Sequence, residues 1–241
     1  MSRIPRIEFA VSFLEVKNMK IAGIGDNVID RYMNMGIMFP GGNAVNVAAH
    51  AALLGAEAAY VGSIGADREG KILKNALESL GVDLSQCIFD PEATTKKCDV
   101  NVIDGERHYI GCDLGTKWAH TTTIRTEDVE YLKTFDVIHT SCNAKLHEDV
   151  YKLKDLTGMV TFDFSVKDKY RTEEFLNMTC PYLELGQFSC DHMEEPEIQE
   201  LLKKSLCTWV QKCNCDYGWP RTDFLQWKRI YKRKSLFCKT C

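Results

Sequence analysis

The stretch from Pro40 to Gly55 constrains the fold of this chain more than any other. It reads Pro-Gly-Gly-Asn-Ala-Val-Asn-Val-Ala-Ala-His-Ala-Ala-Leu-Leu-Gly. Two adjacent glycines permit a tight turn and let the backbone approach a ligand closely. The alanines, valines and leucines that follow are apolar around most of a helix circumference, so the pattern predicts a buried helix over 41–54.

Two asparagines interrupt this apolar pattern. Asn43 and Asn46 are three residues apart, which places them on one face of the first helical turn. Their amides both donate and accept hydrogen bonds. Two asparagines behind Gly41 and Gly42 favour binding of a polyhydroxylated ligand. For Asn43 alone, a role as helix cap is an equally good explanation.

The rest of the chain alternates between short apolar strands and amphipathic helices. We expect an α/β fold with a mostly parallel sheet covered on both faces. The expected strands are 19–24, 58–62, 137–140, 160–164 and 183–188, and the expected helices after the first are 67–81, 145–156 and 194–204.

An alternating segment does not fit this strand–helix order. Residues 98–102 alternate apolar and polar, and Asp104-Gly105 is a strong hairpin turn before 108–110. We interpret the region 94–112 as a flap outside the main sheet.

Polar side chains follow three of the expected strands. Asp26, His139 and Asp163 stand at or beside strand ends, where open α/β sheets bind ligands. We expect Asp26 to contact ligand, although a carboxylate here can instead cap a neighbouring turn. Asp163 suits either the phosphate and metal side of a site or bonding to nearby amides. His139 is predicted to be a hydrogen-bonded core residue.

Composition excludes several classes of function. The 241 residues carry a net charge of -4 with acidic and basic residues mixed, so no nucleic-acid surface is expected. No apolar run approaches the roughly 20 residues that cross a bilayer, so no membrane partner is expected. Six cysteines up to Cys190 are scattered singly, which predicts reduced thiols and a cytoplasmic location.

Taken together, these motifs resemble those of a known family. Gly25-Asp26 with Asp30, Gly41-Gly42-Asn43 with Asn46, and 62–67 with Gly70 resemble the N-terminal half of the ribokinase-like (PfkB-type) carbohydrate kinases. The sequence of residues 24–30, 41–48 and 162–165 is most similar to that of the fructoselysine 6-kinase subfamily. The resemblance covers about residues 19–204 and implies a three-layer α/β sandwich with a small β lid, truncated at its C-terminal end.

The resemblance also implies an activity, cofactors and partners. It implies phosphorylation of a hydroxyl on a sugar or glycated amino acid, with ATP and Mg²⁺ as cofactors. Asp26 would hold sugar hydroxyls, and Gly42, Asn43 and Asn46 would wrap the sugar. The hairpin at 94–112 would be the lid, through which a homodimer would form.

One motif of the family is missing from these 241 residues. Such kinases carry a Gly-Ala-Gly-Asp segment whose aspartate is the catalytic base and whose amides bind phosphate. The sequence contains no such segment, so no catalytic residue is assigned and little turnover is expected. The alternative function is a non-catalytic, sugar-binding or regulatory remnant of a kinase.

The two ends of the chain differ from its middle. Residues 205–241 hold eight Lys and Arg against two Asp and Glu, five of the 11 cysteines and three of the four tryptophans. We interpret them as a frameshifted tail. Cys213, Cys215, Cys238 and Cys241 offer zinc as a less favoured alternative, and no other metal site is predicted. Residues 1–18 show no periodic pattern. The bases that encode residues 14–16 can contain a ribosome-binding sequence before Met19, so we interpret residues 1–18 as a non-native leader.

The genetic code provides a test of the frameshift. Read one base later, the codons for 212–220 permit Asn-Val-Ile-Val-Thr-Met-Gly-Gly-Gln, a buried strand running into a glycine turn. We predict that the DNA encodes Gly-Ala-Gly-Asp in that frame soon after the codon for Cys241. Sequencing past this codon checks the prediction, and a shifted frame without the motif contradicts it.

Overall fold

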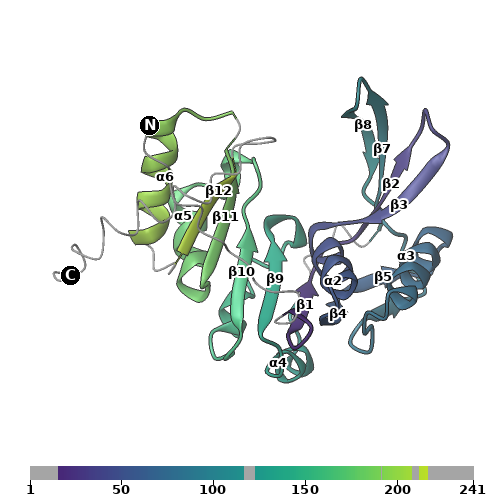
Figure 1. Cartoon of the computed structure of the whole chain (residues 1–241), viewed down its shortest axis with the longest axis horizontal. Coiled ribbons are helices and arrows are strands. Elements are labelled where there is room, and N and C mark those ends of the chain that lie inside the picture. The colour runs from purple at the N-terminus through teal and green to yellow at the C-terminus, as the bar shows by residue number, and fades with distance from the viewer. Residues whose placement is uncertain (1–15, 117–122, 191, 208–211, 217–241) are drawn as a thin grey trace, which may run out of the picture.

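A six-stranded sheet forms the centre of the computed structural model, which describes residues 16–116, 123–190, 192–207 and 212–216 (Figure 1). Its order is β12-β11-β10-β9-β1-β4, and all neighbouring strands are parallel. The strands are β1 (Lys20–Ile24), β4 (Glu57–Val61), β9 (Val137–Ser141), β10 (Met159–Asp163), β11 (Leu185–Ser189) and β12 (Lys212–Asp216). The prediction of a mostly parallel sheet is confirmed.

Helices cover the sheet on two faces, because successive side chains of a strand point in opposite directions. In β4, Ala58 and Tyr60 pack with α2 and α3, whereas Ala59 and Val61 join the second core cluster, which includes residues of α4, α5 and α6. The helices are α2 (Asn43–Leu53), α3 (Arg68–Ser79), α4 (Thr126–Leu132), α5 (Glu173–Thr179) and α6 (Glu195–Cys207). The three-layer prediction is therefore confirmed.

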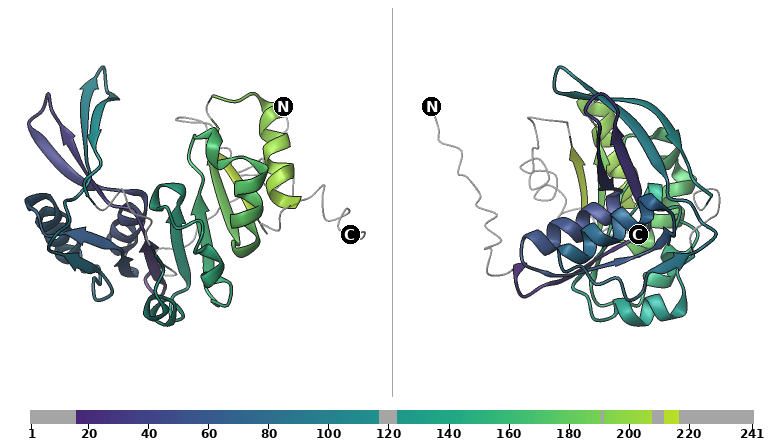
Figure 2. Two further views of the ribbon diagram at one scale, coloured as in Figure 1. Left: turned by 180° about the vertical axis from the view of Figure 1, so that it is seen from behind. Right: turned by 90° about the vertical axis from the view of Figure 1, so that its right-hand side faces the viewer.

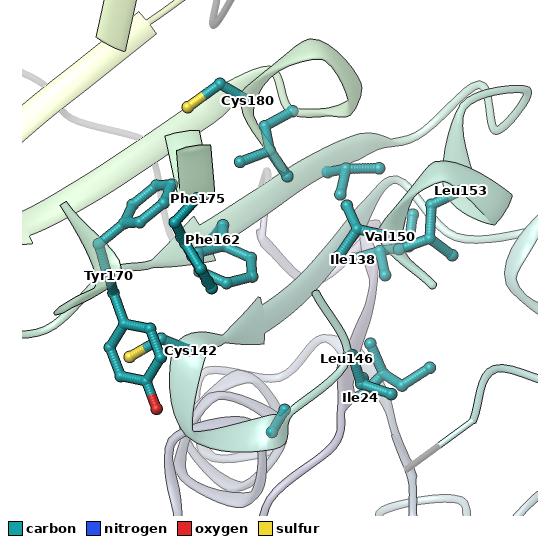
Figure 3. Close-up of a cluster of buried hydrophobic side chains, with 14 of the residues drawn as sticks. Ile24, Ile138, Cys142, Leu146, Val150, Leu153, Phe162, Tyr170, Phe175 and Cys180 are labelled. Carbon is teal, nitrogen blue, oxygen red and sulfur yellow. The ribbon is translucent and has the colours of Figure 1, made fainter. Parts of the chain in front are cut away.

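The second cluster contains a group of aromatic rings, of which Figure 3 labels Phe162, Tyr170 and Phe175. Phe164 of the loop after β10 stacks on Phe188 of β11, with ring centroids 4.4 Å apart and planes 8° apart. Phe162 lies 4.6 Å from Phe164, and Phe175 of α5 closes the group. This packing joins β10, β11 and α5 into one unit.

The chain order around β1 creates a crevice. β1 pairs with β4 on one side and with β9 on the other, although β4 is the next central strand in sequence and β9 comes much later. The chain runs from β1 to β4 on one side and from β9 to β10 on the other side. These opposite directions open a space above the carboxyl ends of β1 and β9. Asp26 follows β1 at this point.

α2 packs unusually closely on β1. A Cβ added to Gly23 of β1 would overlap the carbonyl group of Ala44, a backbone group in the first turn of α2. Small residues on the same helix, Ala44, Ala48 and Ala51, are buried against the sheet. This close contact fixes the distance between the N-terminus of α2 and the carboxyl end of β1.

A separate four-stranded sheet projects from the central sheet as a lid (Figure 1 and Figure 2). Its order is β3 (Ile37–Gly41), β2 (Val28–Tyr32), β7 (Lys97–Ile103) and β8 (Glu106–Asp113). The predicted turn at Asp104-Gly105 joins β7 to β8, with φ values of 51° and 83°. The predicted hairpin thus forms half of the lid, and sequence reasoning missed the half contributed by β2 and β3.

The prediction that all six cysteines up to Cys190 are free thiols is wrong for two of them. Cys98 and Cys112 face each other on β7 and β8 and form a disulfide. Their sequence positions gave no hint, because the pairing depends on the register of the lid hairpin. Cys87, Cys142, Cys180 and Cys190 are free.

Two other expectations require correction. The segment 145–156 contains no α-helix; it includes the short 3-10 helix η3 (Val150–Leu153), which follows η2 (Cys142–Ala144). The last helix does not end at 204: α6 continues to Cys207, and β12 adds an edge strand beyond it. The interpretation of 205–241 as a frameshifted tail stays a prediction, and 1–15, 208–211 and 217–241 lie outside the described residues.

Two short strands and two further 3-10 helices complete the description. β5 (Ser63–Gly65) pairs with β6 (Ile88–Asp90), and η4 (Asp168–Tyr170) and η5 (Cys180–Tyr182) flank α5. Among the helices that the structure describes, none has the length and apolar character to cross a membrane.

The contact between α2 and β1 predicts a sharp difference between two glycine substitutions. Gly23→Ala should destabilise the fold by about 1–3 kcal/mol or more, because a backbone group must move to admit the methyl group. Gly111→Ala on β8, where an added Cβ meets nothing within 4 Å, is the control. Urea unfolding measures both, and equal stabilities of the two variants would contradict the packing argument.

Candidate functional site

A cavity of about 300 Å³ lies at the carboxyl end of β1. Its walls come from the segment after β1, the β4–β5 connection, the residues before the lid strand β7 and the turn after β9. Polar and charged residues in this lining include Asp26, Asn27, Ser63, Lys96, Asn143 and Lys145. The volume is at the lower end of the range typical of small-molecule sites.

Two hydrogen bonds fix the carboxylate of Asp26. Its Oδ1 accepts from the hydroxyl of Ser141 at 3.0 Å, and its Oδ2 accepts from the backbone amide of Asn43 at 2.9 Å. The carboxylate therefore joins the ends of β1 and β9 to the first residue of α2. A carboxylate accepts about four hydrogen bonds, so acceptor positions remain for a ligand in the cavity.

Tyr60 of β4 also fixes the backbone around Asp26. The hydroxyl of Tyr60 donates to the carbonyl of Gly25 at 2.8 Å, and the side-chain amide of Asn27 donates to the same hydroxyl at 2.8 Å. Tyr60 is fully buried. The loop that carries Asp26 is thus anchored to β4 on both sides of the carboxylate.

The side chain of Asn43 links two further strands. Its Nδ2 donates to Oδ2 of Asp163, and its Oδ1 lies against Nε2 of His139. The structure places no side-chain cap hydrogen bond at the start of α2, where Gly42 is the N-cap residue. The alternative of Asn43 as helix cap is therefore wrong, and its amide instead bridges β9 and β10.

His139 is a buried core residue, as expected, with 8% of its surface exposed. Because Oδ1 of Asn43 can only accept, Nε2 carries the proton, and Nδ1 accepts from the hydroxyl of Thr161 at 2.7 Å. Burial lowers the pKa of His139 to about 4, and the charge of Asp26 acts in the opposite direction. The imidazole is therefore neutral near pH 7.

Asp163 bonds nearby amides in this structure. Its Oδ1 accepts from the amide of Ser165 at 2.7 Å, and its Oδ2 accepts from Asn43. Asp163 is not among the residues that line the cavity. Of the two roles considered for it, the local one has the observed contacts.

Gly42 and Asn46 occupy different surroundings. Gly42 has a φ of 108°, and a Cβ there would come within 2.6 Å of the carbonyl oxygen of Asp26, so glycine is required next to the site. Asn46 is exposed and lines a groove along α2 with His50 and Leu54. The structure brings Asp26, Gly42 and Asn43 together and leaves Asn46 on the outer face.

The residues of this site that sequence reasoning missed include Ser141, Asn143, Lys96 and Lys145. Ser141 is the last residue of β9 and Asn143 lies two residues beyond it, so the rule that selected Asp26 at a strand end would also have found them. Lys96 precedes a lid strand and Lys145 follows a 3-10 turn. No sequence signal distinguishes these two lysines from surface lysines.

The described residues contain no group of three or more His, Cys, Asp or Glu side chains arranged to hold a metal ion. The zinc alternative is not tested, because the side chains of Cys213 and Cys215, and all of Cys238 and Cys241, lie outside the described part of the chain.

Comparison with known proteins identifies the family. The model of the pfkB family carbohydrate kinase matches residues 27–162, which are more than half of the chain and include the lid and most of the cavity lining. The chain belongs to this family. The expectation drawn from Gly41–Asn43 and Asp26 is thereby confirmed at the family level.

Curated relatives match most of this chain. It is 32% identical to the fructosamine kinase FrlD of Bacillus subtilis over 187 residues, which are 77% of this chain and 64% of the relative. It is 29% identical to the fructoselysine 6-kinase of Escherichia coli over 147 residues, which are 61% of this chain and 55% of that protein. The chain thus spans less than two thirds of these relatives' length.

Solved structures show the same fold. The ribokinase of Arabidopsis thaliana, complexed with ribose and ATP, has a TM-score of 0.67 at 16% identity over 82% of this chain and 72% of that one. A fructokinase of Xylella fastidiosa with bound ATP has a TM-score of 0.64 at 17% identity, covering 83% and 72%. The ribokinase-like prediction is confirmed.

The buried His139 predicts a specific dependence of stability on pH. Its pKa is about 4 when folded and near 6.5 when unfolded, so its neutral form stabilises the fold above pH 6.5. This contribution should be lost progressively as the pH falls from 6.5 towards 4, since the unfolded chain binds the proton more readily.

Urea unfolding between pH 7 and 4.5 tests this expectation by comparing the protein with His139→Gln. The stability difference between them should shrink as the pH falls. His108→Gln, at an exposed lid position, is the control for replacing a histidine. A difference for His139→Gln that stays constant over this pH range would contradict the assignment of a neutral buried imidazole.

Proposed function

We propose that this chain is the sugar-binding part of an ATP-dependent kinase that phosphorylates a hydroxyl of a sugar or fructosamine. The observation that carries the proposal is the carboxylate of Asp26, which lines the cavity and is oriented by Ser141 and the amide of Asn43. A fixed carboxylate with remaining acceptor positions suits a ligand with several hydroxyl groups. Gly42 lets the start of α2 lie against the backbone of Asp26 and Asn27, which keeps the amide of Asn43 at this carboxylate.

The relatives support the choice of substrate and cofactors. Two curated relatives are named fructosamine kinase and fructoselysine 6-kinase, and two structural neighbours contain ATP. We therefore propose a fructosamine or fructoselysine as substrate and ATP as phosphoryl donor. Mg²⁺ would bridge the phosphates, as in phosphoryl transfer generally. Asp163 remains a proposed residue of that side of the site.

We further propose that the 241-residue chain binds sugar without appreciable turnover. No Gly-Ala-Gly-Asp segment occurs in the sequence, and positioning a sugar without a base and a phosphate cradle gives little rate enhancement. Binding without turnover is also what a regulatory remnant of a kinase would show. Kinase activity in an extended reading frame, and not in this chain, would favour the enzyme over the remnant.

A cytoplasmic location belongs to the same proposal. Four free cysteines among the described residues agree with a reducing compartment, whereas the disulfide between Cys98 and Cys112 does not.

Substitution of Asp26 tests the sugar site. Asp26→Ala should weaken the binding of fructosamine by about five- to 150-fold, because the hydroxyls lose a charged acceptor worth about 1–3 kcal/mol. Asp155→Ala, an exposed carboxylate on the loop before β10, is the matched control. Calorimetry measures both affinities, and unchanged binding by Asp26→Ala would refute the assignment.

We also propose that two copies of the chain associate through their lids. The lid carries exposed apolar side chains, among them Phe39 at 52%, Tyr109 at 63% and Ile110 at 59% exposure. Exposed apolar patches of this kind mark interaction sites. A second lid presents the same apolar residues and can bury them in a two-fold interface.

Light scattering coupled to size exclusion tests this dimer. Ile110→Glu should convert it to a monomer, because the charge would be buried in the interface. Leu53→Glu, on α2 and 64% exposed, should leave the dimer intact. A monomeric unsubstituted protein, or equal behaviour of both variants, would contradict the proposal.

A further inference from the structure

The lid carries a disulfide in a chain that also has several free thiols. Among the described residues, Cys98 is bonded to Cys112, whereas the free cysteines are Cys87, Cys142, Cys180 and Cys190. Burial raises the pKa of Cys87 and of Cys142 to about 12, and Cys180 and Cys190 are completely buried. Because a thiol reacts as its thiolate, these four groups are protected from reaction near pH 7. The disulfide is therefore the exposed sulfur chemistry of this part of the chain.

The two members of the disulfide differ in their exposure to solvent. Cys98 lies on β7, between the neighbouring strands β2 and β8, and is 6% exposed. Cys112 lies on β8, the edge strand of the lid, where all eight residues are exposed. A thiol in solution can therefore reach the bond from the side of Cys112 while the lid stays folded. Exposed disulfides are the labile ones, whereas buried structural ones resist reduction.

β8 depends on β7 for its position. In the lid order β3-β2-β7-β8, β7 is the strand that pairs with β8, and Figure 1 shows the two strands projecting together from the rest of the molecule. Their ladder has a bulge directly beside the disulfide, at Asp99 and Val100, which leaves Ile110 of β8 out of register. The regular pairing on which β8 depends is thus interrupted next to the covalent link.

A second side-chain link between β7 and β8 lies one residue from the disulfide. Lys97 pairs with Asp113 at 3.3 Å, and the side chain of Asp113 is 59% exposed. An exposed ion pair of this kind contributes little to stability, because water screens both charges. The covalent bond between Cys98 and Cys112 is therefore the stronger of these two links at this end of β8.

We infer that Cys98 and Cys112 are a redox modification site that exchanges with a low-molecular-weight thiol of the glutathione class, and that this exchange sets how firmly β8 is held on the lid. A reducing compartment, as we propose for this chain, keeps most thiols reduced, and the disulfides that do form there are transient and often sense redox state. A reversible bond reconciles the disulfide with the four free thiols. The inference goes beyond sugar binding at Asp26 and does not depend on it.

The exchange balances without any further reactant. A glutathione thiolate attacks Sγ of Cys112, the S–S bond breaks, and its electron pair leaves on Sγ of Cys98, which takes up a proton. A second glutathione thiolate attacks the glutathione sulfur of the mixed disulfide and releases Cys112 as a thiolate, which is protonated in turn. Two glutathione molecules are oxidised to one glutathione disulfide, and the protein disulfide is reduced by two electrons. The reverse reaction forms the bond.

The consequence reaches the part of the lid for which we propose self-association. Tyr109 and Ile110 belong to β8, on the far side of the bulge from the disulfide. In the oxidised form the bond holds the near end of β8 against β7. In the reduced form this end is held by the ladder and by the exposed ion pair, so β8 should separate from β7 more often.

Peptide mapping of the full chain tests the exchange. The folded protein is equilibrated without denaturant in buffers that run from glutathione alone to glutathione disulfide alone, and free thiols are then alkylated and located by mass spectrometry. Cys98 and Cys112 should convert together and reversibly from a bonded pair to two thiols, while Cys87 stays a thiol throughout. A bond that resists glutathione until the protein is denatured, or a pair that stays reduced in every buffer, would overturn the inference.

Hydrogen exchange of the two forms tests the effect on β8. Reduction should speed the exchange of the amides of Glu106–Asp113 by about tenfold or more, since loss of a disulfide removes a constraint on the chain that it closes. The amides of Val28–Tyr32, in the inner strand β2, are the internal control and should exchange equally in both forms. Equal exchange of β8 in both forms would refute the proposed control of the lid.

Substitutions assign the effect to this pair of cysteines. Cys112→Ser should show the fast exchange of the reduced form in every glutathione buffer, whereas Cys87→Ser should respond as the unsubstituted chain does. A response of β8 that survives Cys112→Ser would assign it to other cysteines and overturn the inference. The two forms of the unsubstituted chain are compared first, so the test does not depend on the folding of a variant.

Discussion

The hydrogen bond from the amide of Asn43 to the carboxylate of Asp26 is the contact on which the site depends. It requires α2 to begin directly over the end of β1, and that placement requires Gly23, whose missing side chain leaves room for the backbone at Ala44. The side chain of Asn43 then reaches β9 and β10 through His139 and Asp163. One residue at a helix start thus connects three parallel strands.

The order of the strands explains why the cavity lies where it does. β1 lies between β4 and β9, and the chain leaves β1 and β9 in opposite directions. The residues that follow the central strands form the walls of the cavity. The β2–β3 half of the lid begins just after Asp26 and ends just before α2, so its position is coupled to both ends of the Asp26–Asn43 contact. The ligand that we propose for Asp26 would lie next to this half of the lid.

Much of this arrangement could be predicted from the sequence, because it depends on local pattern. The glycine pair and apolar run identified α2, and the strand-end rule found Asp26. That Lys96 and Lys145 line the cavity depends on the fold bringing together residues far apart in the chain, which no local pattern records. The pairing of Cys98 with Cys112 likewise needs the register of β7 and β8. Asn46 shares a helix face with Asn43 and is exposed beside it in the groove along α2, whereas the side chain of Asn43 bonds to His139 and Asp163.

The central claim is that sugar binds in the cavity at the carboxyl end of β1 with its hydroxyls on Asp26. A crystal structure of the chain grown with a fructosamine tests this most directly. The account predicts sugar density within hydrogen-bonding distance of the Asp26 carboxylate, with Asn43 still bonded to His139 and Asp163. Sugar bound instead in the groove of α2 beside Asn46 and His50, with the Asp26 cavity holding only water, would contradict it.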